Sequence, residues 1–120
     1  MNPINLGLRF LLEIASLVGI GWAAWSATAS FWRWPLVIAA PLAAIVLWTV
    51  FAVPEDPSRS GNAPVPVSGL IRLGVEFIFL GGGVAGFVLA GRPIIALALA
   101  VLLVIHYVWS YERIVWLLQR

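Results

Sequence analysis

Two arginine–glutamate pairs are the residues of this sequence whose types and spacing could do chemistry. Arg9 is followed four positions later by Glu13, and Arg72 is followed four positions later by Glu76. Each pair opens a long apolar run, so the chain reads as two halves of similar design. An unpaired charge in the middle of a membrane costs about 2.5–3.5 kcal/mol. These groups must therefore face inward, where they either pair with one another or carry a proton or cation.

Two further residues fall in the same layer. Counted inward from the ends of their apolar runs, Glu13, Glu76, His106 and Trp48 all lie about 8–12 Å deep at about 1.5 Å per residue. Trp48 and His106 also occupy matching positions in the two halves. Carboxylates and an imidazole at one depth would suit a proton or cation pathway. We favour the structural alternative, in which buried ion pairs hold the helices in register.

The pairing itself has two competing geometries. We expect Arg9 to meet Glu76, and Arg72 to meet Glu13, across the two halves of the chain. The competing arrangement pairs each arginine with the glutamate four residues on in its own helix, but the arginine-first order makes this the weaker contact. Either arrangement satisfies the charges.

Other kinds of chemistry find little support. Imidazole and carboxylate ligands from His106, Glu13 and Glu76 could hold iron or zinc, but no helix carries two such ligands three or four residues apart. The chain has no cysteine, and it contains no phosphate-binding loop, dinucleotide fingerprint or nucleophile elbow. Its arginines are scattered singly, unlike a nucleic-acid-binding patch. We expect no cofactor, no metal, no nucleic-acid partner and no enzymatic activity.

The composition requires a membrane environment for these charges. The chain has 120 residues, of which 62% are hydrophobic and 10% are charged, and its mean hydropathy is +1.04. Soluble domains are about half apolar and a quarter charged. The polar side chains are too few to cover a soluble surface, so we expect the lipid bilayer to surround the protein.

The elements that position the charges are four predicted transmembrane helices in an all-α bundle. A polar linker over 54–67, rich in proline and expected to be solvated, divides the chain into two tandem helical hairpins that form a parallel internal repeat. His106, Ser110 and Arg113 share one face at helical spacing. The helices are predicted over residues 5–28, 35–53, 68–90 and 93–111, the last with a helical extension to 118.

Small residues mark where the helices are expected to pack closely. Ala15, Gly19 and Ala23 form a row along the first helix, and Gly82 and Gly86 form a pair in the third. Such spacings let two helix backbones approach in a membrane.

Arginine positions predict the orientation. Positively charged residues collect on the cytoplasmic side of membrane proteins. Five arginines are predicted on one side of the membrane and two on the other: Arg9, Arg59, Arg72, Arg113 and Arg120 against Arg33 and Arg92. The side with five arginines also holds both termini, so we expect both termini in the cytoplasm.

Several short motifs together carry a resemblance to a known family. They are the opening from Asn2 to Glu13, the Arg33-Trp34-Pro35 turn, the stretch from Pro41 to Trp48, the Arg72-x-x-x-Glu76 repeat and the Gly91-Arg92-Pro93 turn. With these motifs the chain resembles the YrdB-like family of small bacterial membrane proteins. The resemblance implies four transmembrane helices and a bacterial origin. We therefore expect the protein in the bacterial cytoplasmic (inner) membrane. The resemblance carries no assigned activity, so it transfers no functional residue.

Two functions follow as hypotheses. In the first, the protein is an interaction, assembly or structural component of the membrane, with a homo-oligomer or a larger membrane complex as its context. In the alternative, it is a small oligomeric transporter or proton- or cation-coupled channel that uses the arginine, glutamate and histidine cluster.

Overall fold

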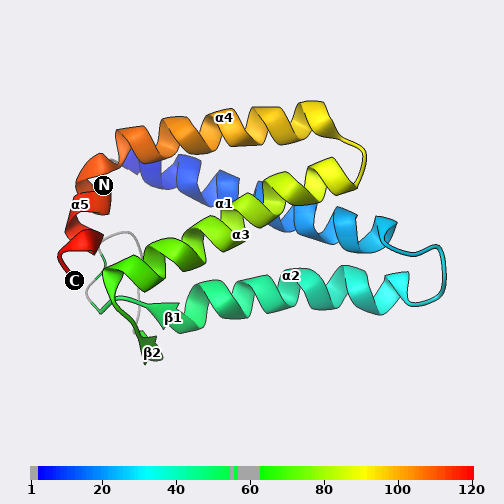
Figure 1. The fold of residues 1–120 in the computed structure, drawn as a ribbon, viewed down its shortest axis with the longest axis horizontal. Coiled ribbons are helices and arrows are strands. Elements are labelled where there is room, and N and C mark those ends of the chain that lie inside the picture. The colour runs from blue at the N-terminus through cyan, green and yellow to red at the C-terminus, as the bar shows by residue number, and fades with distance from the viewer. Residues whose placement is uncertain (1–2, 55, 57–62) are drawn as a thin grey trace.

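The fold is a bundle of helices. The computed structural model describes residues 3–54, 56 and 63–120. Two strands of two residues each pair in parallel where the chain passes from one hairpin to the next. In chain order the elements are α1 (Pro3–Ser26), α2 (Arg33–Val50), β1 (Phe51–Ala52), β2 (Val65–Pro66), α3 (Gly69–Leu89), α4 (Pro93–Trp109) and α5 (Tyr111–Leu118) (Figure 1).

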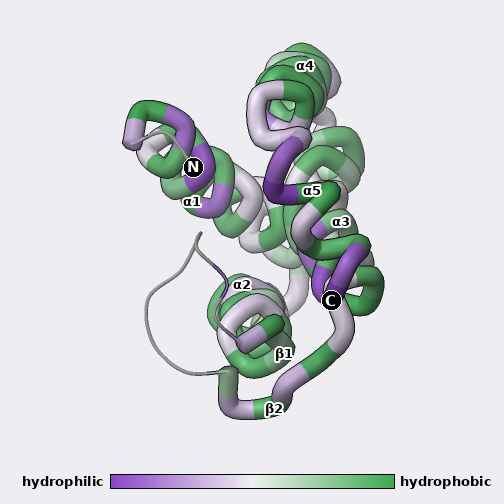
Figure 2. The backbone as a smooth tube through the Cα atoms, turned by 90° about the vertical axis from the view of Figure 1, so that its left-hand side faces the viewer, coloured by the Kyte–Doolittle hydropathy of each residue, from purple (hydrophilic) through white to green (hydrophobic). Residues whose placement is uncertain are grey.

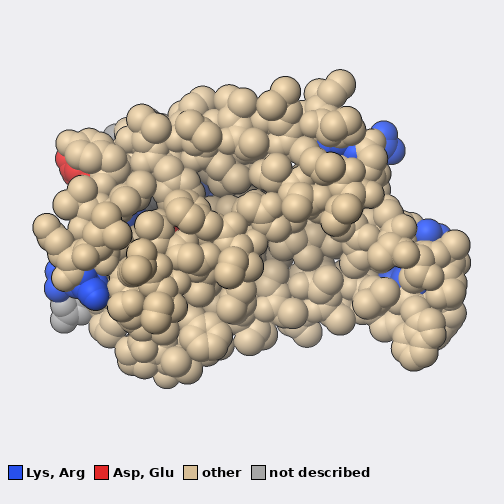
Figure 3. Space-filling model, in the orientation of Figure 1, with Lys and Arg blue, Asp and Glu red and all other residues tan. Residues whose placement is uncertain are grey.

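Several of these helices are long and apolar enough to cross a bilayer. Helices α1, α2 and α3 each qualify, and α4 with α5 makes a fourth if the bent pair counts as one span. Charged atoms on the visible face gather almost entirely at the two ends of the long axis, with uncharged residues between them (Figure 3). This distribution is consistent with a multi-pass membrane protein whose middle lies in hydrocarbon.

Helices α1 and α3 form the centre of the bundle. Helix α2 flanks α1, and α4 flanks α3 (Figures 1 and 2). Both helix turns lie at one end of the bundle, and α5 lies at the other end. The apolar core is built mainly from α1, α3 and α4, with Leu12, Phe79, Leu80, Phe87, Ala96 and Leu99 as its buried members. No residue of α2 is buried.

Glycines let α1 and α3 cross closely. Gly86 lies against the backbone of Gly19, and Gly83 lies against Ser16. Of the three expected glycines, Gly82 is the exception, because a Cβ added there would meet Ile20 at an ordinary 3.7 Å. Gly83 and Gly86, three residues apart, share the face that points at α1, and Gly82 sits at its edge.

The other two small residues expected in α1 are alanines, and both are half-buried. Ala15 packs against the apolar core and is half-buried. Ala23 is half-buried near the end of the helix. The close approach to α3 lies at the middle of α1, at Ser16, Gly19 and Ile20.

The turn between α3 and α4 follows from its sequence. Gly91 adopts a left-handed conformation with φ of 76°, which glycine accepts without steric cost. Pro93 then occupies the first turn of α4, where a missing backbone N–H is harmless. The two helices return antiparallel as a hairpin.

The structure differs from the sequence-based expectation in three places. The helix expected over 35–53 ends at Val50, and Phe51–Ala52 form β1. The helix expected over 93–111 with an extension to 118 ends at Trp109, and α5 follows at an angle of 69°. The linker expected over 54–67 was predicted to be solvated, yet Asp56 is 4% exposed. Residues 55 and 57–62 lie outside the described part of the chain. The bend before α5 and the burial of Asp56 bring polar side chains to the same end of the bundle.

Candidate functional site

The centre of the site is the carboxylate of Glu76 on α3. It is ion-paired with Arg9 of α1 and with Arg113 of α5, and the Arg113 Nη1 atom lies 2.7 Å from Oε1 and 3.0 Å from Oε2. The exposed fractions of the three residues are 0% for Glu76, 3% for Arg9 and 4% for Arg113. One buried acid thus joins three helices.

Arg113 extends the network into the segment between the hairpins. Its Nη2 atom donates to Asp56 Oδ2 at 2.6 Å, and its Nε atom donates to Oδ1 at 3.3 Å. This two-point geometry is the strong form of an arginine–carboxylate pair. The bend before α5 makes the contact, because it turns Arg113 back over the end of the bundle.

His106 of α4 joins the network through α1. Its Nδ1 atom lies 2.8 Å from Asn5 Oδ1, and its Nε2 atom lies 3.4 Å from Arg9 Nη1. The Asn5 amide nitrogen in turn donates to Ser110 Oγ. A guanidinium group has only donors, so Nε2 must accept and the ring proton must sit on Nδ1. The contacts therefore select one neutral tautomer of His106.

We expect nitrogen NMR to detect this tautomer. The protein has one histidine, so histidine labelled with ¹⁵N gives an unambiguous signal. The spectrum is expected to show a protonated Nδ1 and an unprotonated Nε2. In Asn5→Leu the partner of the Nδ1 proton is lost, and a mixture of tautomers is expected. A single Nε2-protonated form in the unmodified protein would contradict the arrangement.

Arg72 of α3 donates hydrogen bonds to backbone carbonyls at the end of α2. Its Nη1 atom donates to the backbone oxygen of Trp48 at 2.5 Å and to that of Phe51 at 2.7 Å. The last carbonyls of a helix have no partner within the helix, so this arginine acts as a cap. The guanidinium carbons of Arg72 and Arg9 also lie 4.5 Å and 4.7 Å from the Trp48 ring centre.

One of the two expected crossed pairs is formed. The Arg9–Glu76 contact across α1 and α3 is confirmed. The expected Arg72–Glu13 pair was wrong: Glu13 instead lies 3.7 Å from Arg9 Nε, four residues away on the same helix. Arg72 is drawn to the α2 carbonyls, and the Glu13 side chain remains 25% exposed.

Sequence reasoning assigned six residues to one polar cluster: Arg9, Glu13, Arg72, Glu76, His106 and Trp48. The structure brings them together with four residues that sequence reasoning did not select: Asn5, Asp56, Ser110 and Arg113. The signal for two of these was present, because Ser110 and Arg113 share helical spacing with His106. Asn5 stands four residues before Arg9 on the same face of α1. Asp56 gave no signal, because a proline-rich context reads as exposed linker.

The site is balanced in charge. Three arginines, Arg9, Arg72 and Arg113, accompany three acids, Glu13, Asp56 and Glu76. Within residues 3–54, 56 and 63–120, no group of three histidine, cysteine, aspartate or glutamate residues is arranged to hold a metal ion. The arrangement suits mutual neutralisation of buried charges.

Comparison with known proteins places the chain in a family. A family profile described as "Protein of unknown function (DUF2568)" matches residues 7–104. The chain belongs to the DUF2568 family. It is also 38% identical to the "Uncharacterized protein YrdB" of Bacillus subtilis (strain 168), over 100% of this chain and 98% of the relative. The resemblance to a YrdB-like family is thereby confirmed. No solved structure matches the chain.

The DUF2568 match covers part of the site. Arg9, Glu13, Trp48, Arg72 and Glu76 fall within the matched residues 7–104. The partners that complete the network lie outside this range, at Asn5, His106, Ser110 and Arg113. The similarity to the Bacillus subtilis protein extends over both parts.

Proposed function

We propose that this DUF2568 protein is a structural and assembly component of the bacterial cytoplasmic membrane and catalyses no reaction. In this proposal it crosses the membrane four times, as two tandem hairpins with both termini in the cytoplasm. The observation that carries the proposal is the buried Glu76, whose two oxygens are occupied by arginines from α1 and α5. A buried carboxylate held by arginines from two other helices ties the three helices together.

The crossed contacts support the tandem arrangement. Arg9 of the first hairpin reaches His106 of the second, and Arg72 of the second reaches Trp48 of the first. Trp48 and His106 stand at the same distance along the chain after Pro35 and Pro93. A two-fold relation between the hairpins would produce both contacts at once.

The outer surface leaves α2 available for contact with lipid or with other helices. No residue of α2 is buried, and large apolar side chains are exposed along every span. Without the hydrophobic effect, helices associate in lipid through close packing and polar contacts. The partners in this proposal are lipid and either further copies of the chain or a larger membrane complex.

The alternative is a proton or cation channel. It would use the same layer, and Glu13 is the acid best placed for it because its side chain is 25% exposed. Glu76, by contrast, would have to leave two arginines to exchange a proton. The saturated contacts of Glu76 favour the structural role.

Proteoliposomes with a pH-sensitive dye inside test the proposal. We expect proton entry no faster than in protein-free liposomes, for the unmodified protein and for Glu13→Gln. The matched control is Glu112→Gln, which removes an exposed acid of α5. Proton entry that Glu13→Gln abolishes and Glu112→Gln preserves, with folding unchanged, would replace the proposal with the channel.

A further inference from the structure

An apolar groove runs between α1 and α2 on the outside of the bundle. Its volume is about 490 Å³, and its lining consists of apolar side chains and one glycine: Ile14, Leu17, Val18, Gly21, Trp22, Trp25, Val37 and Pro41. From Ile14 to Trp25 the groove follows α1 for about 16 Å at about 1.5 Å per residue. This length is about half of a hydrocarbon core that is about 30 Å thick, so the groove matches one leaflet.

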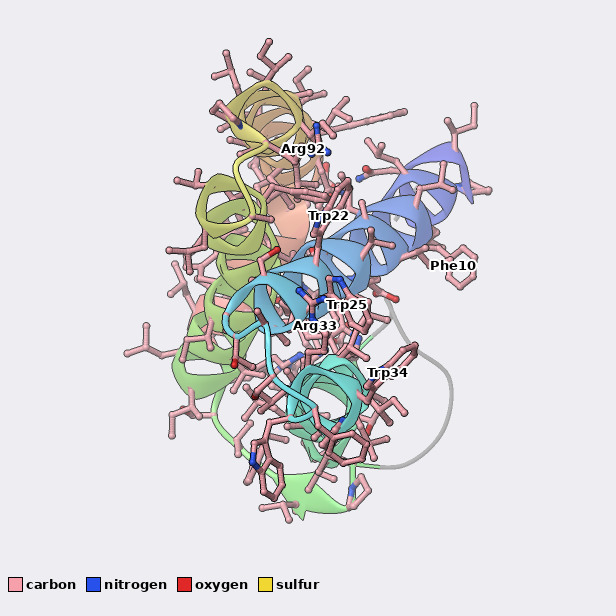
Figure 4. The ribbon with its side chains drawn as sticks, turned by 90° about the vertical axis from the view of Figure 1, so that its right-hand side faces the viewer. Phe10, Trp22, Trp25, Arg33, Trp34 and Arg92 are labelled. Atoms are coloured by element: carbon pink, nitrogen blue, oxygen red, sulfur yellow. The ribbon has the colours of Figure 1, made fainter. Side chains whose placement is uncertain are left out.

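An arginine stands at the end of this groove. The guanidinium carbon of Arg33 lies 4.2 Å from the ring centre of Trp25, and its Nε atom donates to the Trp25 backbone oxygen at 3.3 Å. The ring of Trp34 packs edge-on against Trp25 at 4.8 Å (Figure 4). These contacts fix the guanidinium in place. Its two terminal amino groups make no hydrogen bond within the described residues.

The charge at this end of the bundle is positive. Arg33 and Arg92 stand near the two helix turns, and Arg92 lies 4.9 Å from the ring centre of Trp22 (Figure 4). The acids that the structure describes belong to the polar network or to α5, and none of them is ion-paired with Arg33 or Arg92: Glu13, Asp56, Glu76 and Glu112. The arginines near the turns therefore have no acidic partner in the described chain.

We propose that this groove is a binding site for one anionic phospholipid. One acyl chain lies along Ile14, Val18 and Pro41, and the headgroup phosphate accepts hydrogen bonds from the terminal amino groups of Arg33. A planar guanidinium matches a phosphate at two points, and its rigid stacking on Trp25 reduces the entropy lost on binding. An apolar groove that ends at a fixed cation matches a molecule with a long tail and an anionic head. This inference rests on the membrane insertion in the proposed function, but not on the role in assembly.

Native mass spectrometry in mild detergent tests the headgroup contact. Phosphatidylglycerol and phosphatidylcholine with identical acyl chains are added in turn. We expect one phosphatidylglycerol to be retained per chain, and phosphatidylcholine to be retained far less. In Arg33→Gln the apparent affinity for phosphatidylglycerol is expected to fall about tenfold, as for a lost charge-assisted hydrogen bond. The matched control is Arg120→Gln, which removes an arginine stacked on Trp116 at the other end.

A second variant tests the acyl-chain groove. Val18→Trp fills the groove, and phosphatidylglycerol retention is expected to fall while the unfolding temperature stays the same, because Val18 is 50% exposed. Val88→Trp, at an exposed valine of α3 outside the groove, is expected to retain the lipid. Equal retention of both lipids, or retention that survives Arg33→Gln and Val18→Trp, would overturn the proposal. A protein chain cross-linked into the groove at Val18 would also overturn it.

Discussion

Glu76→Gln is expected to destabilise the folded protein by about 3–5 kcal/mol, the usual cost of removing one partner of a buried ion pair. Glutamine has nearly the same shape, so the loss comes from charge and not from packing. Arg9 and Arg113 would remain buried at 3% and 4% exposure without the acid between them. Reversible unfolding in detergent micelles, followed by the loss of helical circular dichroism, measures this difference.

The matched control is Glu13→Gln, at the glutamate of the other Arg-x-x-x-Glu motif. Glu13 contacts one arginine at 3.7 Å and its side chain is 25% exposed, so the expected loss is about 0–1 kcal/mol. Equal losses for the two variants would contradict the assignment of Glu76 as the centre of the network. Sequence alone does not distinguish Glu13 from Glu76, so a difference between the two variants tests the role that the structure assigns to Glu76.

The inequality of the two glutamates also shows where sequence reasoning reaches its limit. The paired spacing of arginine and glutamate predicted that the charges would meet, and the cost of a lone charge in lipid predicted that they would face inward. Which acid takes the central place depends on Arg113, and Arg113 reaches it through a bend of 69° before α5. Hydrophobic periodicity carries no information about such a bend.

The helical architecture was more accessible to sequence reasoning than the details of the site. Long apolar runs separated by proline, glycine and polar residues predict helices in lipid, because every backbone group must be satisfied internally. The pairing of Arg72 was not accessible. Arg72 could pair either with a distant acid or with backbone carbonyls at the end of α2. In the tertiary structure it donates to the carbonyls of Trp48 and Phe51.

The segment between the hairpins shows a second limit. Its prolines and polar residues have the composition of a solvated linker. Asp56 is nevertheless buried, because Arg113 offers it a two-point contact at 2.6 and 3.3 Å. A composition-based prediction averages over a segment, whereas burial of one carboxylate depends on a single partner far along the chain.

Alanine substitutions along the glycines of α3 are expected to have effects of opposite sign. Gly86→Ala places a methyl group against the backbone of Gly19 and at 3.0 Å from the Ile20 nitrogen. Backbone atoms cannot rotate away, so α1 and α3 must separate, and a loss of about 1–3 kcal/mol is expected. Gly81→Ala meets nothing within 4 Å, so the better helix propensity of alanine is expected to stabilise the protein by up to about 1 kcal/mol.

The same unfolding measurement in detergent compares the two variants, and it separates close packing from the general weakness of glycine in a helix. Both substitutions improve helix propensity equally, so any difference between them reports the neighbours of each position. Gly83→Ala, which lies against Ser16, is expected to behave like Gly86→Ala. Because Arg9 and Glu76 reach each other from these two helices, a wider crossing should also weaken that ion pair. If Gly86→Ala were as stable as Gly81→Ala, α1 and α3 would not cross at the distance that the buried network requires.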